Sequence, residues 1–177
     1  MIILGIDPGT ATTGYGVLSV DGDRFETLAF DLIETSKNGR PEKRLSVIHE
    51  ELLNIISQFT PHVMAIEKVF FATNRKTAIR VGQAQGVMLL AAAHFDIPVV
   101  EYAPGTIKKV VGGNGKADKK HMQRSLRRMF GAHIRSKKKG RTHFDNAADA
   151  LAVALCHACH EMKIDMTTIN QNSDGRA

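Results

Sequence analysis

Long apolar runs are missing from this 177-residue sequence, and none approaches the roughly 18 consecutive apolar residues that a membrane-spanning helix needs. The first residues also lack the basic region, apolar core and cleavage site of a signal peptide. These two absences argue against a secreted or membrane protein, so we expect a soluble, cytoplasmic chain with no membrane partner. The 43% of hydrophobic residues are enough for one globular domain with a sizeable core.

Cysteine is also scarce, and tryptophan is absent. The two cysteines, Cys156 and Cys159, lie in the stretch CHACHE beside His157 and His160, an arrangement that raises the question of a metal site. No second Cys/His pair elsewhere completes a tetrahedral zinc site, and the stretch continues an Ala- and Leu-rich helical pattern. We therefore interpret both residues as helical cysteines in a reducing compartment.

Acidic residues are almost absent from one region of the chain. The segment from Lys116 to Arg141 holds 11 of the 24 Lys and Arg residues and a single acid, Asp118. The remainder is mildly acidic, with 13 basic and 17 acidic residues, so this segment alone produces the net charge of +6. A charge run is often only a solvated face, but one this dense and of one sign favours a polyanion such as nucleic acid.

Hydrophobic periodicity predicts one α/β domain over residues 1–163, followed by a flexible tail at 164–177. The N-terminal half is expected to form strands over 2–6, 14–20 and 24–35, a helix over 41–59, and a short strand that finishes at Glu67. A long helix over 74–95 and a strand over 97–102 follow. Many small residues in the long helix permit close approach of another helix, either within one subunit or across a dimer.

The C-terminal half is predicted to be mostly helical. A short helical turn follows residue 103, residues 110–115 form a glycine-rich flexible junction, and a helix with one basic face runs from 117 to 130. Residues 132–142 are expected to be mobile and polycationic. The last helix covers about 144–162, with Asp145 or Asn146 as its N-cap candidate.

Three carboxylates stand at positions where active sites form. Asp7 and Glu67 each end a buried apolar strand, and the carboxyl ends of such strands line a crevice in α/β sheets. Asp7 taken alone could equally cap the Pro8-Gly9 turn. Asp149 lies one turn inside the last helix among alanines and leucines, so its charge must meet water, a cation or a metal.

Together these carboxylates have the composition of a hard-cation site. Oxygen ligands favour Mg²⁺ or Mn²⁺, and a pair of such ions can clamp the attacking water and the leaving oxygen of a phosphodiester. The basic segment would hold the phosphate backbone. Phe70 stands beside cations that include Lys76, in a loop where an aromatic ring can stack on unpaired bases. The pattern predicts a metal-dependent nuclease.

Four motifs, in this order and at these spacings, resemble the RuvC family of bacterial Holliday-junction resolvases: GIDPGTATTGYGV, AIEKVFF, YAPGTIKKVVGGNGKADKK and DNAADALAVALCH. The resemblance covers nearly the whole chain, from Ile2 to His160. It implies an α/β, ribonuclease-H-like fold with a mixed five-stranded sheet flanked by helices on both faces. It also implies a homodimer that binds four-way junction DNA, nicks two strands symmetrically, and works with the RuvA–RuvB branch-migration complex.

The resemblance also assigns roles to single residues. Asp7, Glu67 and Asp149 match the family's catalytic metal ligands, which hold Mg²⁺ with two ions per active site. Phe70 matches an aromatic residue that contacts junction bases. Lys108 and Lys119 match lysines that the family needs for DNA and for the scissile phosphate.

One position departs from the family pattern. Three residues before the last catalytic Asp the family usually carries Asp or sometimes His, and this chain has Asn146. An amide oxygen can ligate a metal but carries no charge and cannot act as a base. Natural divergence, compensation by Asp145 or His143, and an inactivating substitution all remain open.

Two alternatives to an active resolvase follow from the sequence. The first is a junction-binding protein without catalytic activity, which Asn146 would explain. The second is a fragment of an actin-like or sugar-kinase-like ATPase, because GIDPGT also resembles the phosphate loop of that superfamily. Such ATPases need a second lobe, for which 177 residues leave little room.

Overall fold

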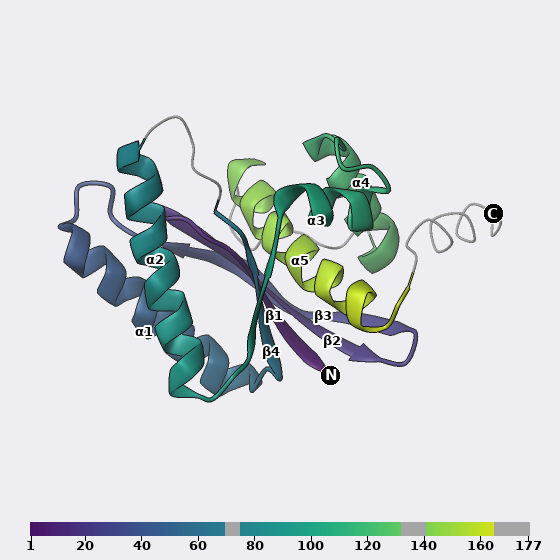
Figure 1. Ribbon diagram of the computed structural model, residues 1–177, viewed down its shortest axis with the longest axis horizontal. Coiled ribbons are helices and arrows are strands. Elements are labelled where there is room, and N and C mark those ends of the chain that lie inside the picture. Colours follow the sequence, from purple (N-terminus) through teal and green to yellow (C-terminus); the bar gives the residue numbers. More distant parts are fainter. Residues whose placement is uncertain (70–74, 132–140, 165–177) are drawn as a thin grey trace.

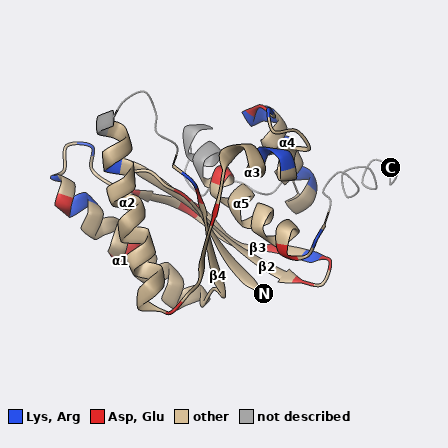
Figure 2. Ribbon diagram, viewed as in Figure 1, with Lys and Arg blue, Asp and Glu red and all other residues tan. Residues whose placement is uncertain are grey.

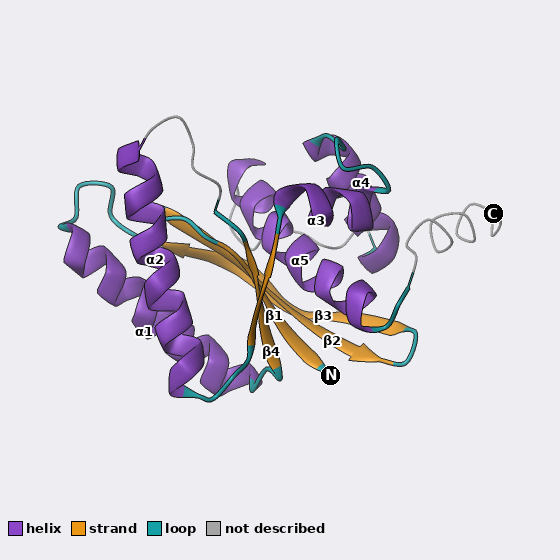
Figure 3. Cartoon of the chain, viewed as in Figure 1, coloured by secondary structure: helices purple, strands orange, loops and turns teal. Residues whose placement is uncertain are grey.

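The computed structural model describes residues 1–69, 75–131 and 141–164, and for 75–76 and 141–146 it describes the backbone alone. Its elements form three layers, with a central sheet between two groups of helices (Figure 1; Figure 3). No helix within these ranges is long and apolar enough to cross a lipid bilayer.

The sheet is mixed and has five strands, as predicted. Its order is β3-β2-β1-β4-β5, and the strands cover Ile2–Asp7 (β1), Thr12–Asp21 (β2), Arg24–Glu34 (β3), Val63–Glu67 (β4) and Val99–Tyr102 (β5). The first three strands pair antiparallel as successive hairpins, whereas β4 pairs parallel with both β1 and β5. Because β1 and β4 are parallel neighbours, their carboxyl ends meet at one edge of the sheet.

Helices cover both faces of the sheet, also as predicted. They span Pro41–Phe59 (α1), Arg75–His94 (α2), Pro104–Gly112 (α3), Lys119–Phe130 (α4) and Arg141–Glu161 (α5). Helices α1 and α2 lie on one face, and α5 lies on the other with α3 and α4 beyond it (Figure 1). Pro41 occupies the first turn of α1, where its fixed φ suits a helix start and its missing N–H costs nothing.

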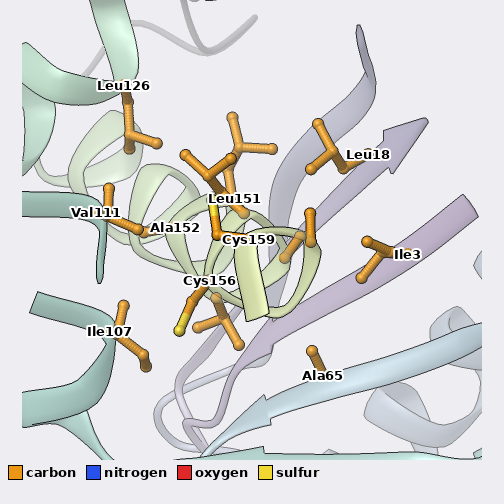
Figure 4. Packing of buried hydrophobic residues seen from close by; sticks show 14 of the residues in the cluster. Ile3, Leu18, Ala65, Ile107, Val111, Leu126, Leu151, Ala152, Cys156 and Cys159 are labelled. Atoms are coloured by element: carbon orange, nitrogen blue, oxygen red, sulfur yellow. The ribbon is translucent and has the colours of Figure 1, made fainter. Parts of the chain in front are cut away.

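Alternation along the strands divides the buried residues into two cores. On β1, Ile3 belongs to the core under α5, whereas Leu4 and Ile6 belong to the core under α1 and α2. Figure 4 shows Leu151 of α5 between the sheet residue Leu18 and the more distant helices α3 and α4. The strand side chains at odd positions of β1 therefore face α5.

Glycines bring α5 unusually close to the sheet. A Cβ atom added at Gly5 of β1 would lie 2.2 Å from the carbonyl oxygen of Ala150 and 2.6 Å from the backbone nitrogen of Ala154. One added at Gly16 of β2 would lie 2.8 Å from the Cα atom of Leu151. The absence of these two side chains sets the depth at which α5 packs.

The cysteine interpretation is confirmed. Cys156 and Cys159 are buried in α5 and form no disulfide. Burial and the neighbouring thiol raise the pKa of Cys156 to about 12, so it stays a protonated, packed thiol. The hydroxyl of Tyr102 lies 2.8 Å from Nδ1 of His157, which satisfies the polar groups next to these cysteines.

Two predicted boundaries were wrong. Residues 110–112 form the last turn of α3 rather than a flexible junction, because Ile107 and Val111, one turn apart, are both buried in the core. Helix α5 begins at Arg141, so Asp145 and Asn146 lie inside it and neither is its N-cap. No Pro or Gly separates Arg141 from Asn146, and nothing in that stretch prevents an earlier helix start.

Several predictions fall outside the described residues. Most of the predicted mobile segment 132–142 is among them, although its last two residues are helical and begin α5, and so is the predicted flexible tail beyond residue 164. The domain boundary at residue 163 therefore stays a prediction.

Candidate active site

Asp7 and Glu67 lie next to each other at the carboxyl edge of the sheet. The parallel register pairs Gly5 with Ala65 and Ile6 with Ile66, which makes Asp7 and Glu67 the next positions on strands about 4.8 Å apart. Both side chains share the sheet face of Ile3 and Gly5, the face that α5 covers. A hydrogen bond between the two carboxyl groups raises the pKa of Asp7 and lowers that of Glu67, which favours the proton on Asp7.

Asp149 brings a third acidic group to this edge. It lies in α5 one residue before Ala150, whose carbonyl oxygen packs against Gly5 of β1. The Asp149 charge acts on both strand carboxylates, so three acidic groups from three elements share one electrostatic environment. The close packing of α5 on Gly5 is what holds this helix residue near the strand ends.

Burial and mutual repulsion shift the proton affinities of the strand carboxylates. Burial first, and then the charges of Glu67 and Asp149, raise the pKa of Asp7 from 3.8 to about 7. Burial and the Asp149 charge likewise raise the pKa of Glu67. The site therefore has more negative charge than its surroundings neutralise, which is the condition that a bound cation relieves.

Two lysines face the carboxylates across a pocket of about 280 Å³. Glu67, Asp149, Lys108 and Lys119 line this pocket together with Asp118 and apolar residues that include members of α3, α4 and α5. Nζ of Lys119 lies 3.1 Å from Oδ2 of Asp149. The charge of Lys119 lowers the pKa of Asp7, and that of Lys108 lowers the pKa of Glu67, so both ammonium groups are directed towards the acidic groups.

Helix α4 is positioned by a residue that sequence reasoning counted only as a charge. Oδ1 of Asp118 accepts a hydrogen bond of 2.7 Å from the backbone N–H of His121, which makes Asp118 the N-cap and places Lys119 at the first helical position. The signal was present in the sequence as an Asp immediately before an amphipathic stretch. The rest of α4 presents basic residues on its outer face (Figure 2).

The turn after Asp7 is fixed by a second residue that the sequence did not single out. The hydroxyl of Thr13, fully buried on β2, donates a hydrogen bond of 2.7 Å to the carbonyl oxygen of Gly9. This bond ties the Pro8-Gly9 turn to the returning strand. A Thr three to four residues after a Pro-Gly turn is too common a pattern to be singled out from the sequence.

These residues fit a hard divalent cation in donor type and charge, although no complete cluster is formed. Among the residues that the structure describes, no three Asp, Glu, His or Cys side chains converge closely enough to enclose a metal ion. The Asp149 carboxylate is instead paired with Lys119. The crowding of Asp7, Glu67 and Asp149, which together with burial raises the pKa values of Asp7 and Glu67, is the observation that favours Mg²⁺ or Mn²⁺, because both ions prefer carboxylate oxygens.

The structure brings together five of the eight predicted site residues. Asp7, Glu67, Asp149, Lys108 and Lys119 gather at one edge. Phe70 lies outside the described residues, and for Lys76 and Asn146 the structure gives the backbone alone. Asn146 lies in α5 three residues before Asp149, and the roles predicted for it and for these DNA contacts remain predictions.

Comparison with known proteins gives a consistent result. Residues 3–157 match the model of the family "Crossover junction endodeoxyribonuclease RuvC". The chain is 46% identical over 157 residues to the RuvC of Pseudothermotoga lettingae, covering 89% of this chain and 93% of the relative. It is 44% identical over 158 residues to the RuvC of Moorella thermoacetica, covering 89% and 91%.

Solved structures agree. T. thermophilus RuvC in complex with a Holliday junction substrate superposes with a TM-score of 0.82 at 32% identity, covering 92% of this chain and 96% of that one. The yeast mitochondrial Holliday junction resolvase Ydc2 shares the fold alone, with a TM-score of 0.66 at 19% identity over 96% and 83% of the two chains. The family match and the sequence identities therefore agree with the site geometry, in which the carboxylates and the two lysines lie together. The protein belongs to the RuvC family of crossover junction endodeoxyribonucleases, whose members are metal-dependent.

Proposed function

We propose that this protein resolves four-way DNA junctions by nicking two strands symmetrically, leaving 5′-phosphate and 3′-hydroxyl ends that a ligase can reseal in recombination and repair. The observation that carries the proposal is the meeting of Asp7, Glu67 and Asp149 with Lys108 and Lys119 at one edge of the sheet, in a chain of the RuvC family. Family membership argues against the ATPase-fragment alternative.

The acidic residues have the first role in this reaction. Asp7, Glu67, Asp149 and Asn146 would hold Mg²⁺ or Mn²⁺, two ions per site, and these ions supply Lewis acidity towards the phosphate when bound. The paired strand ends keep Asp7 and Glu67 at a fixed spacing, so these two ligands are preorganised, whereas Asp149 is paired with Lys119. Water attacks the phosphorus in line with the leaving 3′-oxygen.

The lysines have the second role. Lys108 and Lys119 place positive charge in the same pocket as the carboxylates, where they hold the scissile phosphate against an otherwise repulsive acidic edge. Lys119 is paired with Asp149, and an ion held by Asp149 would supply the positive charge that Lys119 supplies there, which leaves Lys119 to contact DNA. Phe70 and Lys76 are proposed to contact bases and backbone at the junction centre, and the RuvA–RuvB complex is the proposed partner.

A direct assay tests this function. The protein is incubated with a synthetic four-way junction and Mg²⁺, and the ends of the products are mapped and religated. A linear duplex of the same sequence is the control substrate. We expect paired nicks in the junction alone, and equal cleavage of both substrates would reject junction specificity.

Asn146 supports a second candidate function, a junction-binding protein that does not cleave. We expect Asn146→Asp to lower the Mg²⁺ concentration that gives half-maximal cleavage by about tenfold, because it adds a charged oxygen ligand three residues before Asp149. Cleavage is measured against Mg²⁺ concentration for both proteins. Cleavage that appears only in the variant would establish the binding-only form, and identical Mg²⁺ curves would exclude residue 146 from the site.

A homodimer is part of the proposal, and α2 offers the surface for it. Its inner face is buried, whereas Ile79 and Leu90 on the outer face are 63% and 59% exposed. Between them, Gly82 and Gly86 have open space where a side chain would stand. This stripe of small and apolar residues, with spacings of three and four, suits the close approach of the same helix in a second copy.

Leu90→Glu is expected to weaken the dimer by about 30-fold or more, because it places a charge within an apolar contact. Sedimentation velocity over a range of protein concentrations measures the change. Leu28→Glu is the matched control, since Leu28 is 39% exposed on β3, away from α2. A Leu90→Glu protein that dimerises as well as the control would contradict an α2 interface.

A further inference from the structure

A second pocket, of about 190 Å³, opens at the same edge of the sheet but on the side of α1 and α2. Thr10, three residues after Asp7, is part of its wall. Three residues span at most about 11 Å of extended chain, so this wall lies close to the carboxylates. Glu67 and Asp149 line the α3–α4 pocket that also holds Lys108 and Lys119, so the short segment from Asp7 to Thr10 connects the carboxylates to this second pocket.

Three cations from separate segments surround this second pocket. Lys37 comes from the loop after β3, Arg44 from the first turn of α1, and Arg80 from α2. No acidic side chain is among the described residues that line it. The blue segments at the ends of α1 and α2 in Figure 2 mark this positive region on the side opposite to α4. Its charge suits a phosphate group.

Arg44 is held in place by hydrogen bonds. Its Nε donates to Oγ1 of Thr35 at 2.9 Å, and that hydroxyl donates to the carbonyl oxygen of Thr10 at 2.6 Å. These bonds link Arg44 to the loop that follows Asp7. They use the Nε donor, so the terminal amino groups of the guanidinium remain the groups that can contact a ligand in the pocket.

The loop beside Arg44 is shaped around its side chain. A Cβ atom at Gly39 would lie 3.4 Å from Cγ of Arg44 and 3.1 Å from the carbonyl oxygen of Ser36. The loop therefore packs against the arginine stem at ordinary contact distance. An arginine whose side chain is already fixed loses less conformational entropy when it binds a phosphate.

The pocket has an apolar floor as well as a charged rim. Leu45 and Ile48 of α1 line its base. A free inorganic anion has no use for apolar surface, whereas a nucleotide presents a phosphate beside the apolar face of its sugar and base. Successive phosphates of one strand advance about 3.4 Å along the axis of duplex DNA. The span of at most about 11 Å from Asp7 to Thr10 therefore corresponds to about three nucleotides.

Resting on the proposed function, we propose that this second pocket binds a nucleotide of the cleaved strand next to the scissile phosphate, with its phosphate on Arg44, Arg80 and Lys37. The strand is then held on both sides of the carboxylates. Lysines of α3 and α4 hold one side, and this pocket holds the other. Such a two-sided hold fixes the position of the phosphate that is cleaved.

Junction affinity in the absence of metal tests the pocket. Dissociation constants of the full chain for a four-way junction are measured in EDTA at several salt concentrations. Arg44→Gln and Arg80→Gln are each expected to weaken binding about fivefold and to reduce the slope of log affinity against log salt by about one. Lys43→Gln is the matched control, because Lys43 is an exposed cation on the same helix that does not line the pocket.

Phosphate replacement locates the contact. Single uncharged methylphosphonates are placed at each of three positions on either side of the scissile phosphate. At one position the replacement should weaken junction binding by the wild type but not by Arg44→Gln, because the variant already lacks the contact between Arg44 and that phosphate. Arg80 is exposed and does not take part in the Arg44–Thr35 hydrogen bond, so Arg80→Gln is a second variant that leaves this bond intact.

Two outcomes would overturn this proposal. The first is equal affinity and salt slope for Arg44→Gln, Arg80→Gln and Lys43→Gln. The second is that Arg44→Gln and Arg80→Gln lose the binding of a free deoxynucleoside monophosphate, measured by NMR, while their junction affinity equals that of the wild type. The pocket would then be a mononucleotide site. Because binding is measured without metal, a failure of wild-type cleavage would reject the proposed function and leave this test intact.

Discussion

Asp7→Asn is expected to reduce junction cleavage by about 10³-fold or more while leaving junction binding within about twofold. Asp7 has the most strongly raised pKa of the carboxylates at this edge, and the charges of both Glu67 and Asp149 act on it. An amide of the same shape removes one negative charge from the proposed metal ligands. Single-turnover cleavage and metal-free binding of the same junction measure the two effects separately.

The same variant should be more stable than the wild type at pH values where the buried Asp7 carboxylate is ionised. The pKa of Asp7 is about 7 in the folded chain against 3.8 in the unfolded chain, so between pH 4 and 7 the folded state retains a proton that the unfolded state has lost. Stability of the wild type therefore falls as pH rises through this window. The loss is complete above pH 7 and is on the order of 2 kcal/mol after solvent screening.

Thermal unfolding in EDTA tests this second effect. Asp7→Asn should melt about 5 °C above the wild type at pH 8, and the difference should vanish near pH 4. Added Mg²⁺ should then stabilise the wild type and not the variant, because binding to the folded state alone raises its stability. A variant that keeps wild-type cleavage, or that melts below the wild type at pH 8, would contradict the assignment of Asp7.

Gly5→Ala is the second large effect, and it acts through packing. A single added methyl group would lie 2.2 Å from the carbonyl oxygen of Ala150, which is backbone and cannot rotate away. We expect a loss of about 3 kcal/mol, or about 8 °C in melting temperature, because α5 must move off the sheet. Cleavage should fall further than stability alone explains, since α5 carries Asp149.

Gly105→Ala is the matched control for this effect. Gly105 lies in α3 with no atom within 4 Å of the added Cβ, so alanine there should be neutral or stabilise the protein by up to about 1 kcal/mol. Differential scanning calorimetry compares the two variants. Equal melting temperatures would mean that the close approach of α5 to β1 does not limit stability.

Much of the fold was readable because local signals agreed with one another. Helix α1 has the predicted bounds, 41–59, since a proline starts it, apolar residues recur at helical spacing, and Thr60 ends it with a left-handed backbone at φ 44°. Strand ends at Asp7 and Glu67 were also predicted, because apolar runs stop there. Two boundaries failed where burial outweighed composition, at residues 110–112, or where a helix extended beyond its apolar pattern, at Arg141.

The sequence by itself determined the chemistry: three carboxylates at element ends, a basic segment, and motifs that place the chain in the RuvC family. Only the tertiary structure decided which of these residues meet. The parallel register of β1 and β4 places Asp7 beside Glu67, and the packing of α5 on Gly5 brings Asp149 to them. The pairing of Lys119 with Asp149 and the pocket around Arg44 join residues 30 or more positions apart. Such contacts depend on how strands and helices pack, and no local pattern encodes them.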